Sequence, residues 1–94
     1  MQKIQRIIMK TINFKELEMF LNIEKTKKSV VDVRTQFANM IYTGTNGIEC
    51  HALAYKIYNS KGEEEYDEKE CEIIRKVSER ALPNFIDAIN DILQ

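Results

Sequence analysis

The sequence has little of what chemical sites are usually built from: one histidine, two cysteines and three glycines in 94 residues. A structural zinc site uses four Cys or His ligands arranged in close pairs, and this chain supplies only Cys50, His51 and Cys71. Cys50 and His51 are adjacent, so on a helix their side chains point about 100° apart and converge poorly. The glycines within Thr43–Gly47 match neither a P-loop nor a dinucleotide fingerprint. We therefore predict no metal and no cofactor.

Long apolar runs are also absent. No stretch approaches the roughly 20 residues of a membrane span, and the N-terminus lacks the apolar stretch of a signal peptide. We therefore expect a cytoplasmic protein with reduced, buried thiols; Cys50 and Cys71 form a disulfide only if their helix faces meet. The 44% hydrophobic and 31% charged content indicates a globular protein, and the length predicts a single domain, 1–94.

The net charge of −1 hides an asymmetry along the chain. Residues 1–61 contain ten Lys or Arg and five acids, whereas residues 62–94 contain four and ten. A chain polarised in this way attracts its own halves, a partner or a second copy, unless the charges simply lie on solvated faces.

The N-terminal third predicts a β-hairpin over residues 17–31. Apolar residues alternate from Leu17 to Ile23, the polar stretch 24–27 turns the chain, and residues 28–31 return it as a second strand. An alternative for the first strand is a short helix capped by Asn13 and Glu16. Residues 1–12 fit helix and strand spacing equally well, and we expect residues 1–8 to be weakly ordered.

Apolar spacing predicts helices over 33–43, 47–59, 67–81 and 83–93. Asp32 is the expected cap of the first helix, with Ser29 as an earlier alternative, and Gly44 should end it in a left-handed conformation. Asp67 and Glu70 form a capping box for the third, and Pro83 begins the fourth.

The second helix, expected to be capped by Asn46 with Glu49, carries apolar side chains over most of its circumference. Cys50, Leu53, Ala54 and Ile57 share one face, which Ile48, Tyr55 and Tyr58 widen. We therefore predict that neighbouring elements enclose this helix from two sides. The expected fold is mostly α (α+β): a compact four-helix domain with the hairpin packed on the helices.

No pattern indicates catalysis. A cysteine nucleophile with His51 as its base also needs an oxyanion site, for which the sequence gives no signal. The carboxylates from Glu63 to Glu70 form a consecutive run, which predicts a solvated segment rather than a catalytic pair. If His51 has no catalytic role, we expect it to lie between Tyr55 and Tyr58 on the flank of its helix. We predict that the protein is not an enzyme.

One basic cluster suggests nucleic acid as an alternative ligand. Lys25, Lys27, Lys28 and Arg34 would surround the hairpin tip and the start of the first helix, where they could touch phosphates. The second helix presents acid and core residues rather than side chains suited to reading bases, and the net charge is not basic.

Several segments resemble small uncharacterised proteins encoded by bacterial phages and integrated mobile elements. They are Val31-Asp32-Val33-Arg34, Phe37-Ala38-Asn39, Ile41-Tyr42, Gly47-Ile48, His51-Ala52-Leu53-Ala54, Lys56-Ile57-Tyr58, Gly62-Glu63 and Pro83-x-Phe85-Ile86-Asp87. The resemblance covers about residues 9–93 and implies an accessory protein of the host cytoplasm. It assigns no activity and no functional residue.

The leading hypothesis is a non-enzymatic accessory or protein-interaction module that self-associates or binds a protein partner. Charge asymmetry and the apolar residues left over from the core (Ile7, Ile8, Phe20 and Tyr42) would form its contact surface. The alternative is a small nucleic-acid-binding regulator that uses the basic hairpin tip. Neither hypothesis involves a membrane or a small-molecule substrate.

Overall fold

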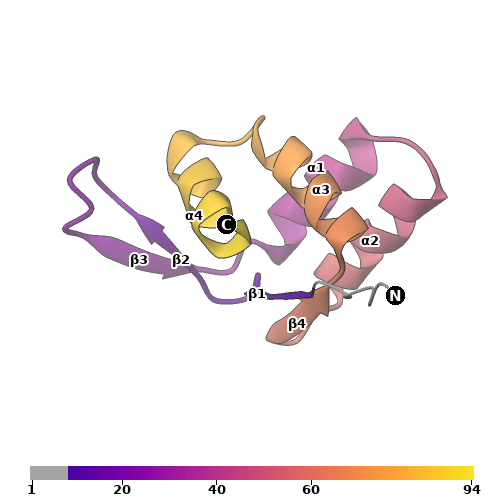
Figure 1. Ribbon diagram of the computed structural model, residues 1–94, viewed down its shortest axis with the longest axis horizontal. Helices are drawn as coiled ribbons and strands as arrows, with labels where there is room; N and C mark the ends of the chain where they lie inside the picture. The colour runs from indigo at the N-terminus through magenta and orange to yellow at the C-terminus, as the bar shows by residue number, and fades with distance from the viewer. Residues whose placement is uncertain (1–8) are drawn as a thin grey trace, which may run out of the picture.

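The computed structural model describes residues 9–94, which form four helices and two small antiparallel sheets of two strands each (Figure 1). The strands are β1 (Lys10–Asn13), β2 (Leu17–Phe20), β3 (Lys28–Val31) and β4 (Glu63–Tyr66). The helices are α1 (Arg34–Gly44), α2 (Ile48–Tyr58), α3 (Glu68–Ser78) and α4 (Pro83–Leu93). The α+β class and the four helices are therefore as predicted, and residues 1–8, including Ile7 and Ile8, lie outside the described residues.

The predicted hairpin is present. β2 and β3 pair antiparallel, with Leu17 opposite Val31 and Phe20 opposite Lys28. The alternative helix for this segment is wrong, because the Asn13 carboxamide oxygen accepts the N–H groups of Lys15 and Glu16 in a turn. We expected the strand to include Leu21 and Ile23. β2 ends at Phe20, so both residues lie beyond it.

The start of α1 differs in detail from the prediction. Ser29 lies inside β3, so the earlier helix start is wrong. Val33 occupies the N-cap position, and the preceding Asp32 carboxylate accepts the backbone N–H of Arg34 at 3.1 Å. Because the aspartate lies one residue before the N-cap, it satisfies a first-turn donor without being the cap itself.

We predicted that the acidic run is a solvated segment, but its first part forms strand β4. β4 pairs antiparallel with β1, from Lys10 opposite Tyr66 to Asn13 opposite Glu63. Ile12 and Tyr66 are buried, whereas Glu63 and Glu65 remain exposed. The two strands lie about fifty residues apart in sequence, so no local pattern announces the pairing.

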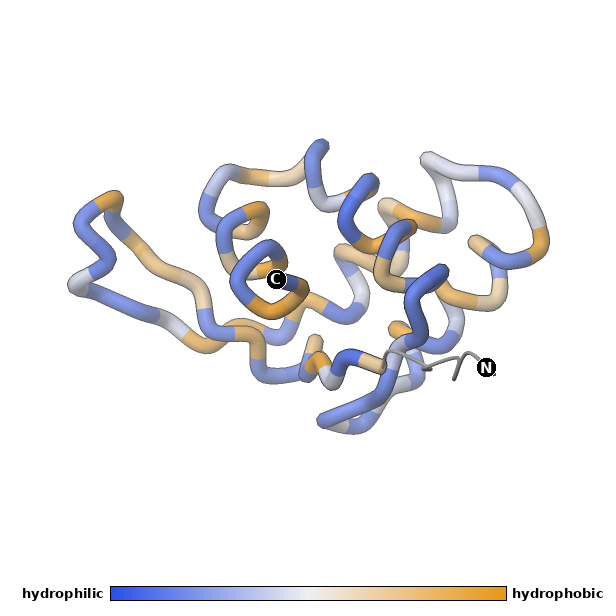
Figure 2. Tube along the Cα trace, viewed as in Figure 1, coloured by the Kyte–Doolittle hydropathy of each residue, from blue (hydrophilic) through white to orange (hydrophobic). Residues whose placement is uncertain are grey.

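Four aromatic rings form the centre of the core. The Phe14 ring lies 5.4 Å from Phe37 and 5.7 Å from Tyr66, and Phe37 lies 5.0 Å from Phe85. These residues come from the chain after β1, from α1, from β4 and from α4, so the aromatic centre joins the β1–β4 sheet to the helices. Along the helices, hydrophobic residues recur between hydrophilic ones, as expected for elements buried on one side (Figure 2).

The prediction that neighbours enclose α2 is wrong in its breadth. Leu53 and Ile57 are buried, at 1% and 0% exposed, but Ile48 is 84% exposed. Tyr55 and Tyr58 are also exposed, at 47% and 53%. α2 packs chiefly against α1 at one end of the molecule, so only a narrow stripe of its apolar residues is covered (Figure 1).

The caps around the α1–α2 connection also differ from the prediction. Gly47, not Asn46, occupies the N-cap position of α2, and no side chain within residues 9–94 caps the helix. Gly47 has φ +99°, whereas Gly44 stays helical and is followed by extended Thr45. The left-handed glycine is therefore at the start of α2 and not at the end of α1.

The signals around α3 and α4 are correct. The Asp67 carboxylate accepts the Glu70 N–H, and the Glu70 carboxylate accepts the Asp67 N–H, which completes the capping box. Pro83 starts α4 after an extended Leu82. α3 ends at Ser78 instead of residue 81, because the N–H groups of Arg80 and Ala81 turn to carbonyls three residues back.

Candidate interaction surfaces

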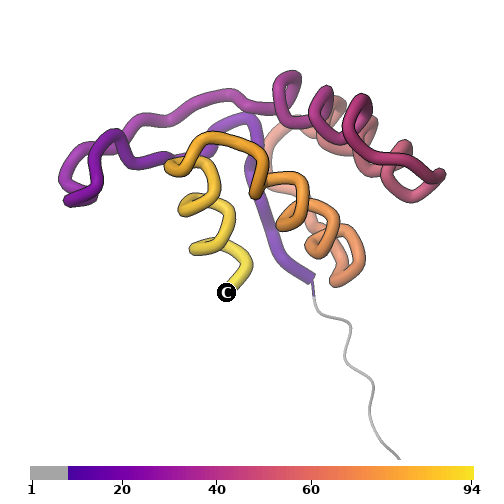
Figure 3. Tube along the Cα trace, turned by 90° about the horizontal axis from the view of Figure 1, so that it is seen from above, coloured from indigo at the N-terminus to yellow at the C-terminus, as the bar shows by residue number. Residues whose placement is uncertain are grey.

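The hairpin of β2, β3 and the connection 21–27, here called the arm, projects from the helical body beyond α4 (Figures 1 and 3). Three of its large apolar side chains face solvent: Leu21 is 61% exposed, Ile23 96% and Val30 56%. Polar contacts hold the tip, since the Asn22 carboxamide oxygen accepts the N–H groups of Thr26 and Lys27. The shape of the tip therefore does not depend on burying its apolar residues.

The root of the arm is fastened to the body on one side only. Leu17 is buried, and Met19 and Val31 pack on the core. The Asn84 amide of α4 donates to the Phe20 carbonyl at 3.0 Å, which closes the outer edge of β2. The opposite strand, β3, lies at the margin of the molecule.

The four basic residues suggested for nucleic-acid contact do not form one cluster. Lys25, Lys27 and Lys28 are exposed on the arm; Lys25 Nζ lies 5.6 Å from the Phe20 ring centre, and Lys28 pairs weakly with Glu18 at 3.5 Å. Arg34 instead joins the start of α1 to the segment after α2. Its guanidinium bonds both Asp32 oxygens and the Ser60 carbonyl.

The Arg34–Asp32 pair perturbs both groups. The hydrogen bonds from Arg34 lower the pKa of Asp32, and the bond to Asp32 raises the pKa of Arg34. Both are ordinary effects of opposite charges in contact. Arg34 is thus a structural cation that holds the β3–α1 junction, with each of its three side-chain nitrogens donating to a protein acceptor.

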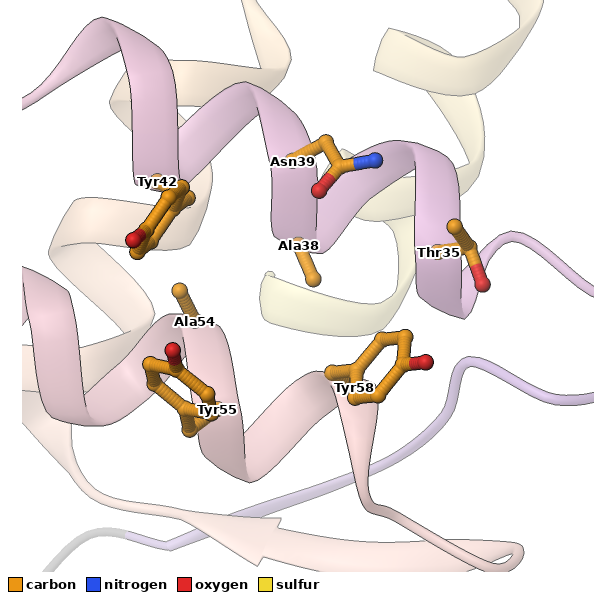
Figure 4. A pocket seen from close by; sticks show the side chains of 7 residues that line it. All are labelled: Thr35, Ala38, Asn39, Tyr42, Ala54, Tyr55 and Tyr58. Carbon is orange, nitrogen blue, oxygen red and sulfur yellow. The ribbon is translucent and has the colours of Figure 1, made fainter.

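A second surface is the tyrosine groove between α1 and α2, a cavity of about 340 Å³ (Figure 4). It is lined by Thr35, Ala38, Asn39, Tyr42, Ala54, Tyr55 and Tyr58. The two alanines lie between the tyrosines, with Tyr42 and Tyr55 toward one end and Tyr58 toward the other. The rings of Tyr42 and Tyr55 meet edge to face, with centroids 6.0 Å apart. Small side chains at the helix contact thus leave room between large, half-exposed rings.

His51 lies beside this groove, but not where the sequence suggested. Its ring is 5.0 Å from Tyr55 and 6.2 Å from Tyr42, rather than between Tyr55 and Tyr58. Of the interface residues proposed from the sequence, Tyr42 is 55% exposed in the groove and Phe20 is half-buried on the arm. The apolar pattern places Tyr55 and Tyr58 on the face of the helix that neighbours should cover, whereas their polar hydroxyls are the sequence signal that favours the surface.

A third concave surface lies between the root of the arm, α1 and the α3–α4 connection. It has a volume of about 430 Å³, and Met19, Val31, Phe37 and Met40 are among the residues that line it. Leu82, at its rim, is 73% exposed. Flexible methionines allow such a surface to adapt to different apolar groups.

The reactive side chains are dispersed. Both cysteines are free thiols, so the faces that carry them do not meet in a disulfide. Cys71 is buried beside the Tyr66 carbonyl, and burial raises the pKa of its thiol, which disfavours the nucleophilic thiolate. Within residues 9–94, no group of three or more His, Cys, Asp or Glu is placed to hold a metal ion.

One buried polar atom is unusual. The Tyr66 hydroxyl is fully buried and lacks a hydrogen-bond partner among the described residues. Ser60 lies near enough to lower the pKa of this phenol, but no hydrogen bond with good geometry joins the two hydroxyls, and the Ser60 hydroxyl donates to the Ile57 carbonyl at 2.7 Å. Burial, with a contribution from Glu64, raises the pKa of this phenol well above its ordinary value. The site is closed to solvent and reads as part of the core.

Comparisons with protein-family models, with curated proteins and with solved structures find no match. In the part of the chain that the structure describes, no helix combines the length and apolar character needed to cross a membrane.

Proposed function

We propose that this protein is a non-enzymatic accessory module of the cytoplasm that binds protein and associates with itself. The observation that carries the proposal is the arm. An isolated two-stranded hairpin is marginal in water, and this one holds Leu21, Ile23 and Val30 in solvent. Burying these side chains against another protein removes exposed apolar area and stabilises the arm at the same time.

The tyrosine groove supports the same function. Tyrosine is enriched at protein interfaces because it offers a large rigid surface with a polar end, at low conformational entropy. Tyr42, Tyr55 and Tyr58 place three such rings around a cavity on the α1–α2 face. Ile48, at the start of α2, adds another exposed apolar side chain to the same helix pair.

A binding role rather than catalysis is supported by the separation of the reactive groups. His51 lies among tyrosine rings at the surface, whereas Cys71 lies in the core. A nucleophile and its base must lie within hydrogen-bond reach of each other, and this pair offers no such arrangement.

Self-association is tested by the solution mass of the full chain. We expect the weight-average mass from light scattering to rise with protein concentration toward that of a dimer, and to respond to salt because charged groups contribute. A monomer mass that stays constant into the millimolar range at both low and high salt would remove self-association from the proposal.

Nucleic-acid binding is a second candidate, supported by the three exposed lysines on the arm. It predicts binding of duplex or single-stranded DNA that weakens steeply with salt. A double variant, Lys25→Gln with Lys27→Gln, should reduce the affinity and the salt slope, whereas Lys76→Gln on α3 should not. Absence of binding to either DNA at low salt ends this candidate.

A further inference from the structure

The outer edge of β3 carries backbone N–H and C=O groups that are available to pair with another strand. The Leu21 N–H donates to the Lys27 carbonyl. Leu21 and Lys27 therefore form a hydrogen-bonded pair. Such pairs occur at every second position of an antiparallel ladder, so Ser29 and Val31 also direct their backbone groups at β2. Lys28 and Val30 therefore direct theirs outward. Figure 3 shows β2 between β3 and α4, which leaves this edge uncovered.

The side chains along this segment alternate in exposure. Lys28, Val30 and Asp32 are exposed, whereas Ser29 and Val31 are half-buried and Val33 is buried. The exposed row is therefore positive at Lys28, apolar at Val30 and negative at Asp32. Such a row is complementary to itself when it is turned by 180°, because the cation then meets the anion and the apolar centre meets its own copy.

We propose that two copies of this chain join through their β3 edges, antiparallel and about a two-fold axis at Val30, into a four-stranded sheet. The proposal rests on the proposed self-association and names its surface. Val30 lies opposite the partner's Val30, and Lys28 opposite the partner's Asp32, twice by symmetry. The backbone groups of Val30 and Lys28 then gain partners in the other copy.

Charge selects this register over its neighbours. An axis at Lys28 would place the two lysines against each other, and an axis at Val31 would place Lys28 against the partner's Arg34. Lysines on an edge strand normally oppose such pairing, whereas in the proposed register each Lys28 meets a carboxylate. Asp32 already binds Arg34, but about half of its side chain (49%) is exposed to receive a second cation.

The first test uses variants of exposed residues, and because Asp32 also accepts hydrogen bonds from Arg34, circular dichroism and thermal melts check that each variant monomer stays folded. Val30→Lys and Lys28→Glu should each weaken the dimer by about tenfold or more, because each change acts twice in a symmetric interface. Asp32→Lys should do the same. A mixture of the Lys28→Glu and Asp32→Lys chains should recover the dimer, since every lysine again meets a carboxylate. Glu72→Lys, a charge reversal at an exposed position of α3, is the matched control and should leave the dimer intact.

The second test reads the register directly. Residues opposite each other in a hydrogen-bonded pair have Cα atoms about 5.5 Å apart, within the range that a disulfide spans. In a Cys50→Ser background, Val30→Cys should form a covalent dimer under mild oxidation, whereas Thr26→Cys at the tip should not.

The outcomes separate the two proposals. A wild-type dimer that Val30→Lys and Lys28→Glu leave unchanged overturns pairing through β3 but keeps self-association. Failure of the two charge variants to recover the dimer when mixed overturns the register. A wild-type chain that remains monomeric overturns both.

Discussion

Lys56 Nζ lies 4.6 Å from the centre of the Tyr66 ring. The same ammonium donates to the Glu65 carbonyl at 2.7 Å and to both Glu70 carboxylate oxygens at 3.1 and 3.2 Å. One side chain of α2 therefore reaches β4 and the capping residue of α3. It joins α2 to β4, which pairs with β1, and to the start of α3.

Replacing this lysine should destabilise the protein measurably. Lys56→Met keeps the aliphatic stem but removes the cation–π contact and the half-buried ion pair, and we expect a loss of about 1–2 kcal/mol in the free energy of unfolding. Lys69→Met is the control, because Lys69 pairs with Glu49 at the open surface and should cost less than about 0.5 kcal/mol. Urea unfolding measures both. Equal losses for the two variants would contradict the assigned role.

The orphan hydroxyl of Tyr66 predicts an unusual response to truncation. Tyr66→Phe removes a buried polar atom that has no hydrogen-bond partner in the described part of the chain, so the free energy of unfolding should be unchanged or rise by up to about 1 kcal/mol. Tyr66→Leu, which instead leaves a cavity, should lower it by about 2–4 kcal/mol. A clear loss in the phenylalanine variant would show that the hydroxyl has a partner, such as a buried water.

The raised pKa of Tyr66 adds a pH dependence. An unfolded phenol ionises near 10.0, whereas the native phenol keeps its proton above that value. The unfolded state then binds fewer protons than the native state, so stability falls as the pH rises above about 10. Wild type should lose stability more steeply than Tyr66→Phe between about pH 9 and pH 11. Parallel slopes in denaturant melts across this range would refute the assignment.

Gly47 and Gly62 provide a matched pair of glycines. Gly47 has φ +99°, so Gly47→Ala should cost about 1 kcal/mol or more although no atom lies within 4 Å of the added Cβ. Gly62 is equally open and lacks a positive φ, so Gly62→Ala should be neutral or stabilise by up to about 1 kcal/mol. Thermal melts of both variants test backbone conformation apart from packing. The reverse order would place the left-handed residue elsewhere.

The capping box of α3 should carry a separable part of the stability. Asp67→Ala leaves first-turn N–H groups without their acceptor and should cost about 1 kcal/mol. Asp87→Ala, an exposed acid in α4, should change the free energy of unfolding by less than about 0.5 kcal/mol. Hydrogen exchange at Glu70 should also quicken in the first variant only, and an unchanged rate there would argue against the cap.

The residues of the arm and of the tyrosine groove show how much of a surface can be predicted from a sequence pattern. The sequence predicts β3 from residues 28–31, and it predicts Tyr42 as an apolar residue left over from the core. It does not predict the exposure of Tyr55 and Tyr58, because periodicity reports which residues share a face and not how much of that face a neighbour covers. The predicted basic cluster is wrong at Arg34, because its guanidinium donates to Asp32 and to the Ser60 carbonyl, which belong to different segments.

The sequence by itself determined the local features: the β2–β3 hairpin, the capping box at Asp67, the break at Pro83 and the existence of four helices. Each depends on residues within a few positions of one another, where sterics and hydrogen bonds act without the rest of the fold. Only the tertiary structure decided that Glu63–Tyr66 is a strand, that α2 lies at the margin, and that the edge of β3 stays open. Those outcomes depend on which distant segments compete for the same apolar surface, and the local pattern of a chain does not contain that information.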